Sequence, residues 1–304
     1  MLSPDIRHYV DFHRTMGLKF KVQEGLLRHF AAFAEPRGDR WVRAETVLAW
    51  ASQAPSVPQR RNRLLVVRRF ALEMQAEDDR YEVPSALAFG KSKRERRMPH
   101  IYSPDDVSRL LRAAATLRPE GSIRPATYTT LLALIVATGL RISEVLALQL
   151  SDFSGSLLVI RNTKFRKNRL VPLHPTTQEG LERYLTRRKK VPGTDSSFFV
   201  SAAGTGLRYS TVYAVFLQLM RSSGLRQGPG MPGPCIHDLR HTFAVRSLEH
   251  CALSEQEIGC HVLALSTYLG HTHPSDTYWY FQATPKLLET ISHRTELLFV
   301  GGAA

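Results

Sequence analysis

The segment 89–99 is the feature that most limits how this chain can fold. Lys91, Lys93, Arg94 and two more arginines outnumber its single acid, and almost none of its side chains is apolar. Such a segment cannot contribute to a core, so we interpret it as a linker between two folded parts, 1–88 and 100–304. Its basic composition suggests contact with a phosphate backbone, although a merely flexible, soluble connector would have the same composition.

Residues 1–88 alternate apolar stretches at helical spacing with short polar breaks, which predicts a small all-helical bundle. Helices are expected over 4–16, 23–34, 43–52 and 59–75. The last of these is strongly basic, which is typical either of a solvated face or of a helix that contacts nucleic acid. Its candidate DNA-binding residues are Arg60, Arg61, Arg63 and Arg68.

The second part is predicted to be mainly helical with a small antiparallel β-sheet. Ser103 with Pro104 and Asp106 forms a capping-box-like helix start. The sequence predicts further helices over 126–137, from Arg141 onward, and beyond 211, where a Gly- and Pro-rich loop at 224–234 interrupts them. It predicts strands over 156–161 and 168–173, and a short one over 198–201.

Composition limits the partners and the setting. Lys and Arg total 41 against 27 Asp and Glu, giving a net charge of +14, which favours a polyanionic partner, nucleic acid before others. No run approaches the length of a membrane span, and the first ten residues lack the apolar core of a signal peptide. Three cysteines without a CxxC pair favour a reducing cytoplasm over a disulfide framework, and their spacing to neighbouring histidines disfavours a zinc site.

Three short clusters carry candidate chemistry. The helix over 126–137 is expected to stop at Thr138 and Gly139, and Arg141 lies at the start of the next one, where backbone N–H groups favour an anion. Glu144 lies one turn on, and taken alone such an Arg–Glu pair is usually only a surface salt bridge. The segment 237–241 (HDLRH) places an imidazole and a guanidinium on one helix face, which indicates a phosphate site. His237 and His241 could instead bind a metal ion, but the segment lacks the glutamate that accompanies such a pair in metalloproteases. Near 280 the tyrosines could supply a nucleophile toward phosphorus or form an aromatic core stripe.

Taken in order, these clusters resemble the tyrosine recombinase, or phage integrase, family over the whole second part. The segment 137–145 (ATGLRISEV) is similar to its first arginine box, 237–244 (HDLRHTFA) to its HxxR box, and 269–271 (LGH) to its third box. Tyr280 lies nine residues after His271, at the position of the family's nucleophile. The segment 163–173 (TKFRKNRLVPL) is similar to the family's β-hairpin.

The resemblance implies a two-domain architecture: a helical core-binding domain, then a mixed α/β catalytic domain. It also implies the chemistry. Tyr280 would attack a DNA phosphate to give a 3′-phosphotyrosyl link, while Arg141, Arg240 and His271 bind the non-bridging oxygens. No ATP, metal or other cofactor would be needed.

Proton transfer and positioning follow from the same resemblance. Lys164 would protonate the leaving 5′-oxygen, with Lys167 as the rival. His237 would assist proton transfer with the nucleophile and hold the phosphate. Glu144 would position the site, and Arg166 and Lys167 would also contact DNA.

The family also implies four protomers on two duplexes, with or without a partner recombinase. The segment 285–299 has apolar residues at helical spacing and is expected to dock on a neighbouring protomer. Two alternatives remain at this point: a topoisomerase with the same chemistry, which supercoil relaxation of random plasmid would reveal, and a catalytically silent DNA-binding protein.

Overall fold

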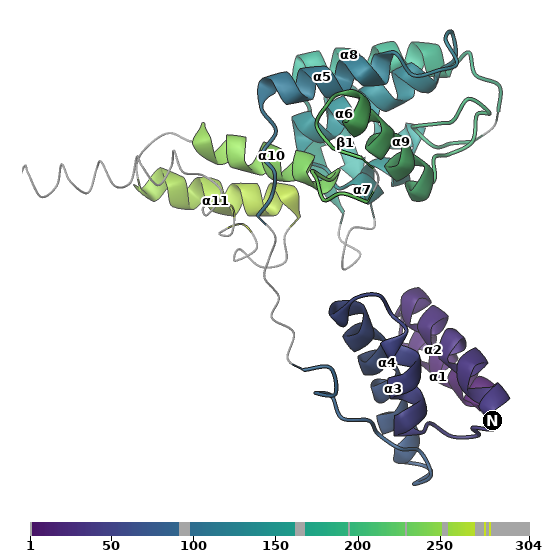
Figure 1. Cartoon of the computed structure of the whole chain (residues 1–304). Coiled ribbons are helices and arrows are strands. Elements are labelled where there is room, and N and C mark those ends of the chain that lie inside the picture. Colours follow the sequence, from purple (N-terminus) through teal and green to yellow (C-terminus); the bar gives the residue numbers. More distant parts are fainter. Residues whose placement is uncertain are drawn as a thin grey trace, which may run out of the picture. The chain divides into compact units, whose positions relative to one another are not determined.

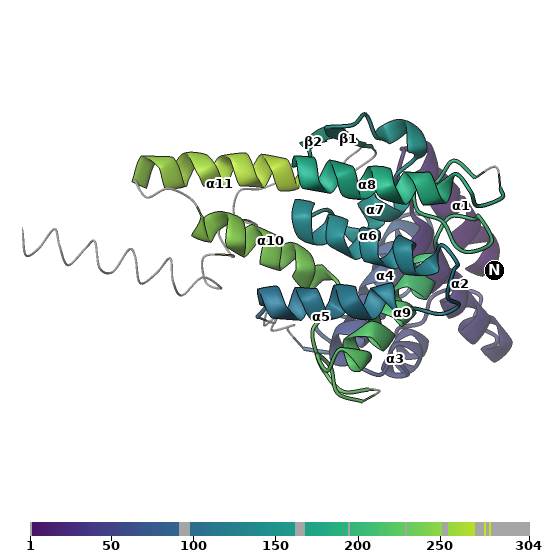
Figure 2. The ribbon, with the colours of Figure 1, turned by 90° about the horizontal axis from the view of Figure 1, so that it is seen from above.

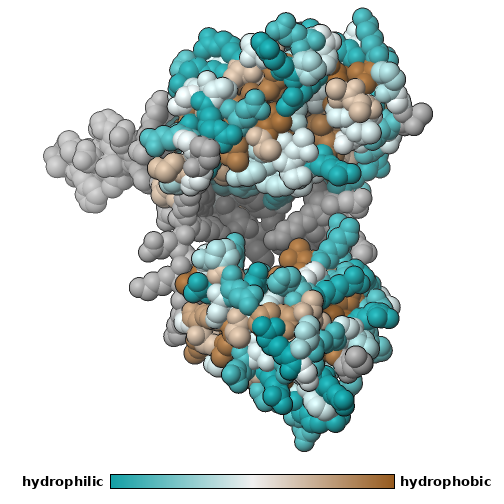
Figure 3. Space-filling model, turned by 45° about the vertical axis from the view of Figure 1, so that its right-hand side comes forward, coloured by the Kyte–Doolittle hydropathy of each residue, from teal (hydrophilic) through white to brown (hydrophobic). Residues whose placement is uncertain are grey.

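A computed structural model describes residues 2–90, 98–161, 168–193, 195–228, 230–250 and 255–270, with Thr277 and Tyr280; residues 255–258 are described by their backbone. The chain divides into two compact units, Met1–Arg96 and Arg97–Ala304 (Figure 1). No helix among these residues is long and apolar enough to cross a membrane. On the face drawn in Figure 3, hydrophilic residues predominate on each unit, and apolar ones form separate small patches.

The first unit is a helical bundle, as the periodicity predicts. In its first helix the buried residues are Leu2, Ile6, Tyr9 and Val10, the spacing of one helix face. Its core is completed by residues such as Phe30, Trp50 and Phe70. The helices are α1 (Leu2–Thr15), α2 (Lys21–Ala34), α3 (Ala44–Ser52) and α4 (Val57–Gln75), with a short 3₁₀ helix, η1 (Glu35–Arg37).

The arginines of the basic helix α4 lie against their own unit. Each of the four candidate DNA-binding arginines is half-buried and donates a hydrogen bond to a backbone carbonyl. The pairs are Arg60 with Ala54, Arg61 with Gly90, Arg63 with Trp50 and Arg68 with Pro84. These bonds fix the loops around α4. A guanidinium carries five N–H donors, so one such bond leaves others for a phosphate.

In the second unit, helix α6 lies against α5, α8 and α10 (Figures 1 and 2). The predicted capping box is confirmed, because Ser103 Oγ accepts from Asp106 N at 3.1 Å and Asp106 accepts from Ser103 N at 2.9 Å. The helices are α5 (Pro104–Ala115), α6 (Arg124–Thr138), α7 (Ile142–Ala147), α8 (Pro175–Arg188), α9 (Tyr209–Ser222), α10 (His237–Glu249) and α11 (Glu255–Leu269), with a 3₁₀ helix, η2 (Leu150–Asp152).

The sheet of the second unit, as far as it is described, is a two-stranded antiparallel hairpin. Strand β1 (Leu157–Ile160) pairs with β2 (Arg169–Pro172), with Leu158 opposite Val171. The expected fold class, mainly helical with a small antiparallel sheet, is confirmed. The strand expected over 198–201 is wrong: Val200 forms only an isolated bridge, with Gly206. That apolar run is continuous because its side chains enter the helical core, not because it belongs to a sheet.

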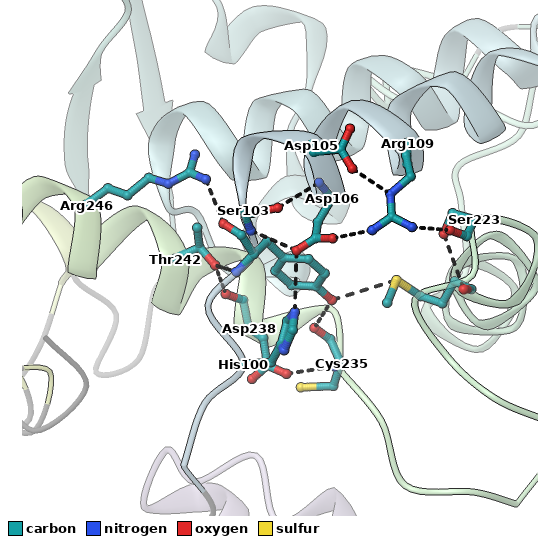
Figure 4. A network of polar contacts seen from close by, with 12 residues as sticks. His100, Ser103, Asp105, Asp106, Arg109, Ser223, Cys235, Asp238, Thr242 and Arg246 are labelled. Carbon is teal, nitrogen blue, oxygen red and sulfur yellow. Dashed lines mark hydrogen bonds and ion pairs between the residues drawn. The ribbon is translucent and has the colours of Figure 1, made fainter. Parts of the chain in front are cut away.

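The chain enters the second unit through a buried residue, Tyr102, that is bound to α10. Figure 4 labels its partners on that helix, Thr242 and Arg246. Its N–H donates to Thr242 Oγ1 at 3.0 Å, and its carbonyl accepts from Arg246 at 2.6 Å. The Tyr102 hydroxyl also lies 3.2 Å from the carbonyl oxygen of Cys235, just before α10 begins. The backbone at the start of this unit is therefore held by side chains of one helix.

Gly139 closes α6 in the left-handed conformation, with φ of +62°. A Cβ there would lie 2.4 Å from Cδ1 of Phe243 and 3.1 Å from Cδ2 of Leu269. We expect Gly139→Ala to lower the free energy of unfolding by about 2–4 kcal/mol, through left-handed strain and overpacking together, as measured by urea denaturation.

Gly121→Ala is the matched control for that variant. Gly121 has φ of +76° with open space around the Cβ position, so strain alone should cost about 1 kcal/mol. Equal losses in the two variants would contradict the argument, since they would mean that Phe243 and Leu269 move aside without cost.

Candidate active site

Arg240 lies at the centre of the second unit and bridges the ends of two helices. The residue is only 1% exposed, and its guanidinium donates to the carbonyl oxygens of Gly139 and Leu269, each at 2.7 Å. These carbonyls close α6 and α11, where the last backbone acceptors of a helix lack partners and the helix dipole is negative. Arg240 is therefore fixed in position by the two helix ends.

Arg141 reaches the same place from the N-terminus of α7. Its guanidinium donates to the carbonyl oxygen of Gly270 at 3.2 Å and to Glu144 at 2.9 Å. Glu144 also accepts from the backbone N–H of Arg141, as an acid in the first helical turn should. The side chain of Arg141 keeps 26% of its surface exposed, so it can meet a ligand.

A third arginine, Arg169 at the start of β2, completes this arrangement. It donates to both carboxylate oxygens of Glu144, at 2.9 and 2.8 Å, and its side chain is 13% exposed. The sequence reasoning gave Arg169 no role. It could have been found by asking how a buried Glu144 is neutralised, because a buried carboxylate needs more partners than one half-exposed arginine supplies.

The electrostatics of this cluster favour an anion. Among the described residues it holds three guanidinium groups, from Arg141, Arg169 and Arg240, and one carboxylate, from Glu144, which leaves a net positive charge. Burial and the nearby charge of Arg141 lower the pKa of Arg240 to about 10, so it is still charged at neutral pH. The positive charges of the guanidinium groups repel one another, and an anion such as phosphate would relieve this repulsion when it binds.

Helix α10 brings two histidines to the cluster. His237 and His241 lie one turn apart, with ring centroids 4.6 Å apart and edge to face. Burial lowers the pKa of His237, and the positive charges of Arg240 and Arg141 lower it further, so this imidazole is neutral at neutral pH. His241 is half-buried, and its Nδ1 lies 3.2 Å from the hydroxyl oxygen of Tyr280.

Tyr280 packs between α10 and α11. It is 2% exposed and shares an apolar cluster with Ala244, Leu248 and Leu265. Its ring is therefore as buried as that of a core residue, which agrees with the prediction that the tyrosines near 280 could belong to the apolar core. Its hydroxyl, however, is in the electrostatic field of Arg240 and in contact with an imidazole, which are the surroundings of a nucleophile.

Several predicted residues lie outside the described part of the chain, so the structure places none of them. They are His271 of the third box, the hairpin residues Lys164, Arg166 and Lys167, and the linker residues Lys91, Lys93 and Arg94. Among the residues that are described, no three His, Cys, Asp or Glu side chains form a group that could hold a metal ion.

Glu144 gives the site a measurable pH dependence. Burial tends to raise its pKa, but the hydrogen bonds and charges of Arg169 and Arg141 outweigh burial and lower the pKa from 4.5 to about 2. A lowered pKa in the folded state stabilises the protein above pH 4.5, and this contribution of about 3 kcal/mol is lost as the pH falls toward 2.

We therefore expect the stability difference between the wild type and Glu144→Gln to shrink between pH 6 and pH 3, as measured by urea midpoints. Comparing the two proteins cancels the contributions of other acids. A difference that stays constant over this range would contradict the assignment.

The model of the phage integrase family matches residues 101–286. The chain is 37% identical to y4rB of Sinorhizobium fredii, by name an integrase/recombinase, over 96% of each sequence, and 28% identical to the tyrosine recombinase XerD of Brucella abortus over 77% of the chain and 75% of that relative.

Solved structures share the fold. The integrase of the Tn1549 transposon, in complex with transposon right end DNA, superposes with a TM-score of 0.64 at 16% identity, over 97% of this chain and 99% of the other. A lambda integrase dimer bound to a core site gives a TM-score of 0.63 at 18% identity, over 92% and 94%.

Proposed function

Because this chain belongs to the phage integrase family, we propose that its Tyr280 cuts DNA at a specific site and holds the cut end as a 3′-phosphotyrosyl ester until a second strand rejoins it. The family match and the similarity to y4rB confirm the resemblance seen in the sequence. They also confirm the class of enzyme, a site-specific tyrosine recombinase. The observation that carries the proposal for this chain is the Tyr280 hydroxyl beside His241, in the field of the buried Arg240.

The described residues have distinct parts in this reaction. Arg141 and Arg240 bind the non-bridging oxygens of the target phosphate, and the protein's own backbone carbonyls hold both side chains at helix ends. Such preorganised donors lower the barrier most where charge develops in the transition state. Glu144 holds Arg141 in place, and His237 supplies a neutral imidazole at the phosphate.

The residues outside the described part enter the proposal from the sequence. His271 adds a third ligand for the phosphate oxygens, and Lys164, or its rival Lys167, protonates the 5′-oxygen as it leaves. Each strand exchange conserves one phosphodiester, since the ester to Tyr280 stores the bond energy until the incoming 5′-hydroxyl attacks. The reaction requires no ATP and no metal ion.

The partner is double-stranded DNA that carries recombination sites. Phosphate contacts from the first unit, through Arg60, Arg61, Arg63 and Arg68, and from the linker would hold the duplex without reading its sequence. Four protomers, with or without a partner recombinase, would bring two sites together. The segment 285–299, which lies outside the described residues, would dock on the neighbouring protomer.

The experiment that tests the proposal maps the covalent bond directly. The wild-type protein is incubated in EDTA with its flanking DNA sites, nicked so that the cut strand cannot rejoin, and the adduct is digested with nuclease and protease. A nucleotide attached through phosphate to the peptide that contains Tyr280 supports the proposal. An adduct on another residue, or none on sites that the protein is shown to bind, contradicts it.

A further inference from the structure

The contact between His241 and Tyr280 bears on how the nucleophile loses its proton. The expectation from the sequence gave that task to His237, the histidine of the HxxR box. In the structure it is Nδ1 of His241, one residue after Arg240, that lies 3.2 Å from the Tyr280 hydroxyl. The two rings are also in contact, tilted by 57° to each other with centroids 5.4 Å apart.

The two histidines lie in different surroundings. Burial and the positive charges of Arg240 and Arg141 lower the pKa of His237, at the first position of α10. His241, one turn further along, faces the phenol and contacts His237 edge to face. The positions of the two residues on α10 thus suit two different tasks.

Burial of Tyr280 makes a local proton acceptor necessary. A phenol has a pKa near 10, so only about 0.1% is ionised at pH 7. With 2% of its surface exposed, Tyr280 has little access to water as a proton acceptor. A neutral imidazole within hydrogen-bond reach is the side chain best suited to accept this proton at neutral pH.

We propose that Nδ1 of His241 takes the phenolic proton of Tyr280 during strand cleavage and returns it during rejoining. This rests on the proposed function. In cleavage the bond from Tyr280 Oη to phosphorus forms, the bond from phosphorus to O5′ breaks, and the proton moves to His241 while the 5′-oxygen takes one from the general acid. In rejoining the same steps run backward, and Tyr280 leaves as a neutral phenol.

The mechanism fixes the state of the imidazole. To accept at Nδ1, His241 must be neutral with its own proton on Nε2, since an imidazolium has no free lone pair. An asparagine in its place offers an amide that can bond the hydroxyl but cannot take up a proton. His241→Asn thus separates positioning from proton transfer.

The test measures single-turnover cleavage by His241→Asn and His241→Ala on two nicked substrates: the ordinary diester, and one with sulfur in place of the leaving 5′-oxygen. Sulfur leaves without protonation, so this substrate needs no general acid. We expect both variants to cleave both substrates about 10²-fold more slowly than the wild type. His250→Asn, an exposed histidine at the end of α10 bonded to the carbonyl of Arg246, is the matched control and should match the wild type.

Two outcomes would overturn the inference. Cleavage by His241→Asn within about threefold of the wild type would reduce His241 to a positioning residue. If the variants cleave the ordinary diester slowly but cleave the sulfur substrate at the wild-type rate, His241 would instead protonate the leaving 5′-oxygen. Failure of the proposed function looks different, because the wild type itself would then form no adduct.

A spectroscopic measurement covers the case in which the variants do not fold. The ¹⁵N resonances of His241 in the wild-type protein should show an unprotonated Nδ1 that accepts a hydrogen bond, and this signal should shift in Tyr280→Phe. A protonated Nδ1, or a signal unchanged by that substitution, would contradict the proposal.

Discussion

Tyr280→Phe is expected to bind its DNA site as tightly as the wild type and to form no covalent adduct, a loss of at least about 10⁴-fold. The ring stays in its apolar cluster with Ala244 and Leu248, so the fold should lose only about 1–2 kcal/mol with the hydrogen bond to His241. Without the hydroxyl oxygen there is no atom to attack phosphorus. Denaturing gels of trapped complexes, beside gel shifts of the native ones, measure both properties.

The neighbouring tyrosine provides the control. Tyr278→Phe removes a hydroxyl two residues earlier and should leave adduct formation in place. Loss of the adduct with Tyr278→Phe and not with Tyr280→Phe would move the nucleophile to Tyr278.

A mixing experiment adds information about which protomer supplies the nucleophile. Because Tyr280 contacts His241 of its own chain, an equimolar mixture of Tyr280→Phe and an Arg240 variant should stay inactive on a single nicked site. Recovered cleavage would mean that the tyrosine of one protomer reaches the arginines of another.

Arg240→Ala is expected to reduce the cleavage rate at saturating DNA by about 10³-fold or more. The substitution removes a buried positive charge from the phosphate and leaves the carbonyl oxygens of Gly139 and Leu269 without their donor. Arg240→Lys keeps the charge but lacks the planar guanidinium whose two separate nitrogens bind the two carbonyls, so a loss of about 10²-fold or more is expected even there.

Arg246→Ala is the matched control on the same helix. Arg246 donates to the carbonyl of Tyr102 and is not part of the phosphate site, so its loss should lower stability while cleavage stays within about threefold of the wild type. An Arg240→Lys variant as active as the wild type would contradict the role given to the guanidinium.

The sequence predicted the helical elements well where the pattern was local. The capping box at Ser103 and the glycine that ends α6 are decided by a few neighbouring residues, and both were read correctly. The apolar run at 198–201 could not be assigned by the same means. A fully buried run looks alike in a strand and in an irregular core segment, and only tertiary packing distinguishes them.

The sequence could predict those residues of the candidate site whose side-chain chemistry by itself suits phosphate binding. The structure brings Arg141, Glu144 and Arg240 into one cluster, and their binding of a phosphate stays a prediction. Arg169 was missed because its partner Glu144 is 25 residues away in sequence and meets it only when the hairpin folds back. His241 was considered only as half of a metal pair, since sequence spacing cannot tell which histidine of one helix face meets a tyrosine 39 residues later.

The attachment of Tyr102 to α10 has a mechanical consequence. Both backbone groups of this residue are bound to side chains of the helix that carries His237 and Arg240. A force that acts on the backbone at Tyr102 is therefore transmitted to that helix through two hydrogen bonds. A displacement of the backbone at Tyr102 would therefore reach the helix to which the proposed reaction assigns His237 and Arg240.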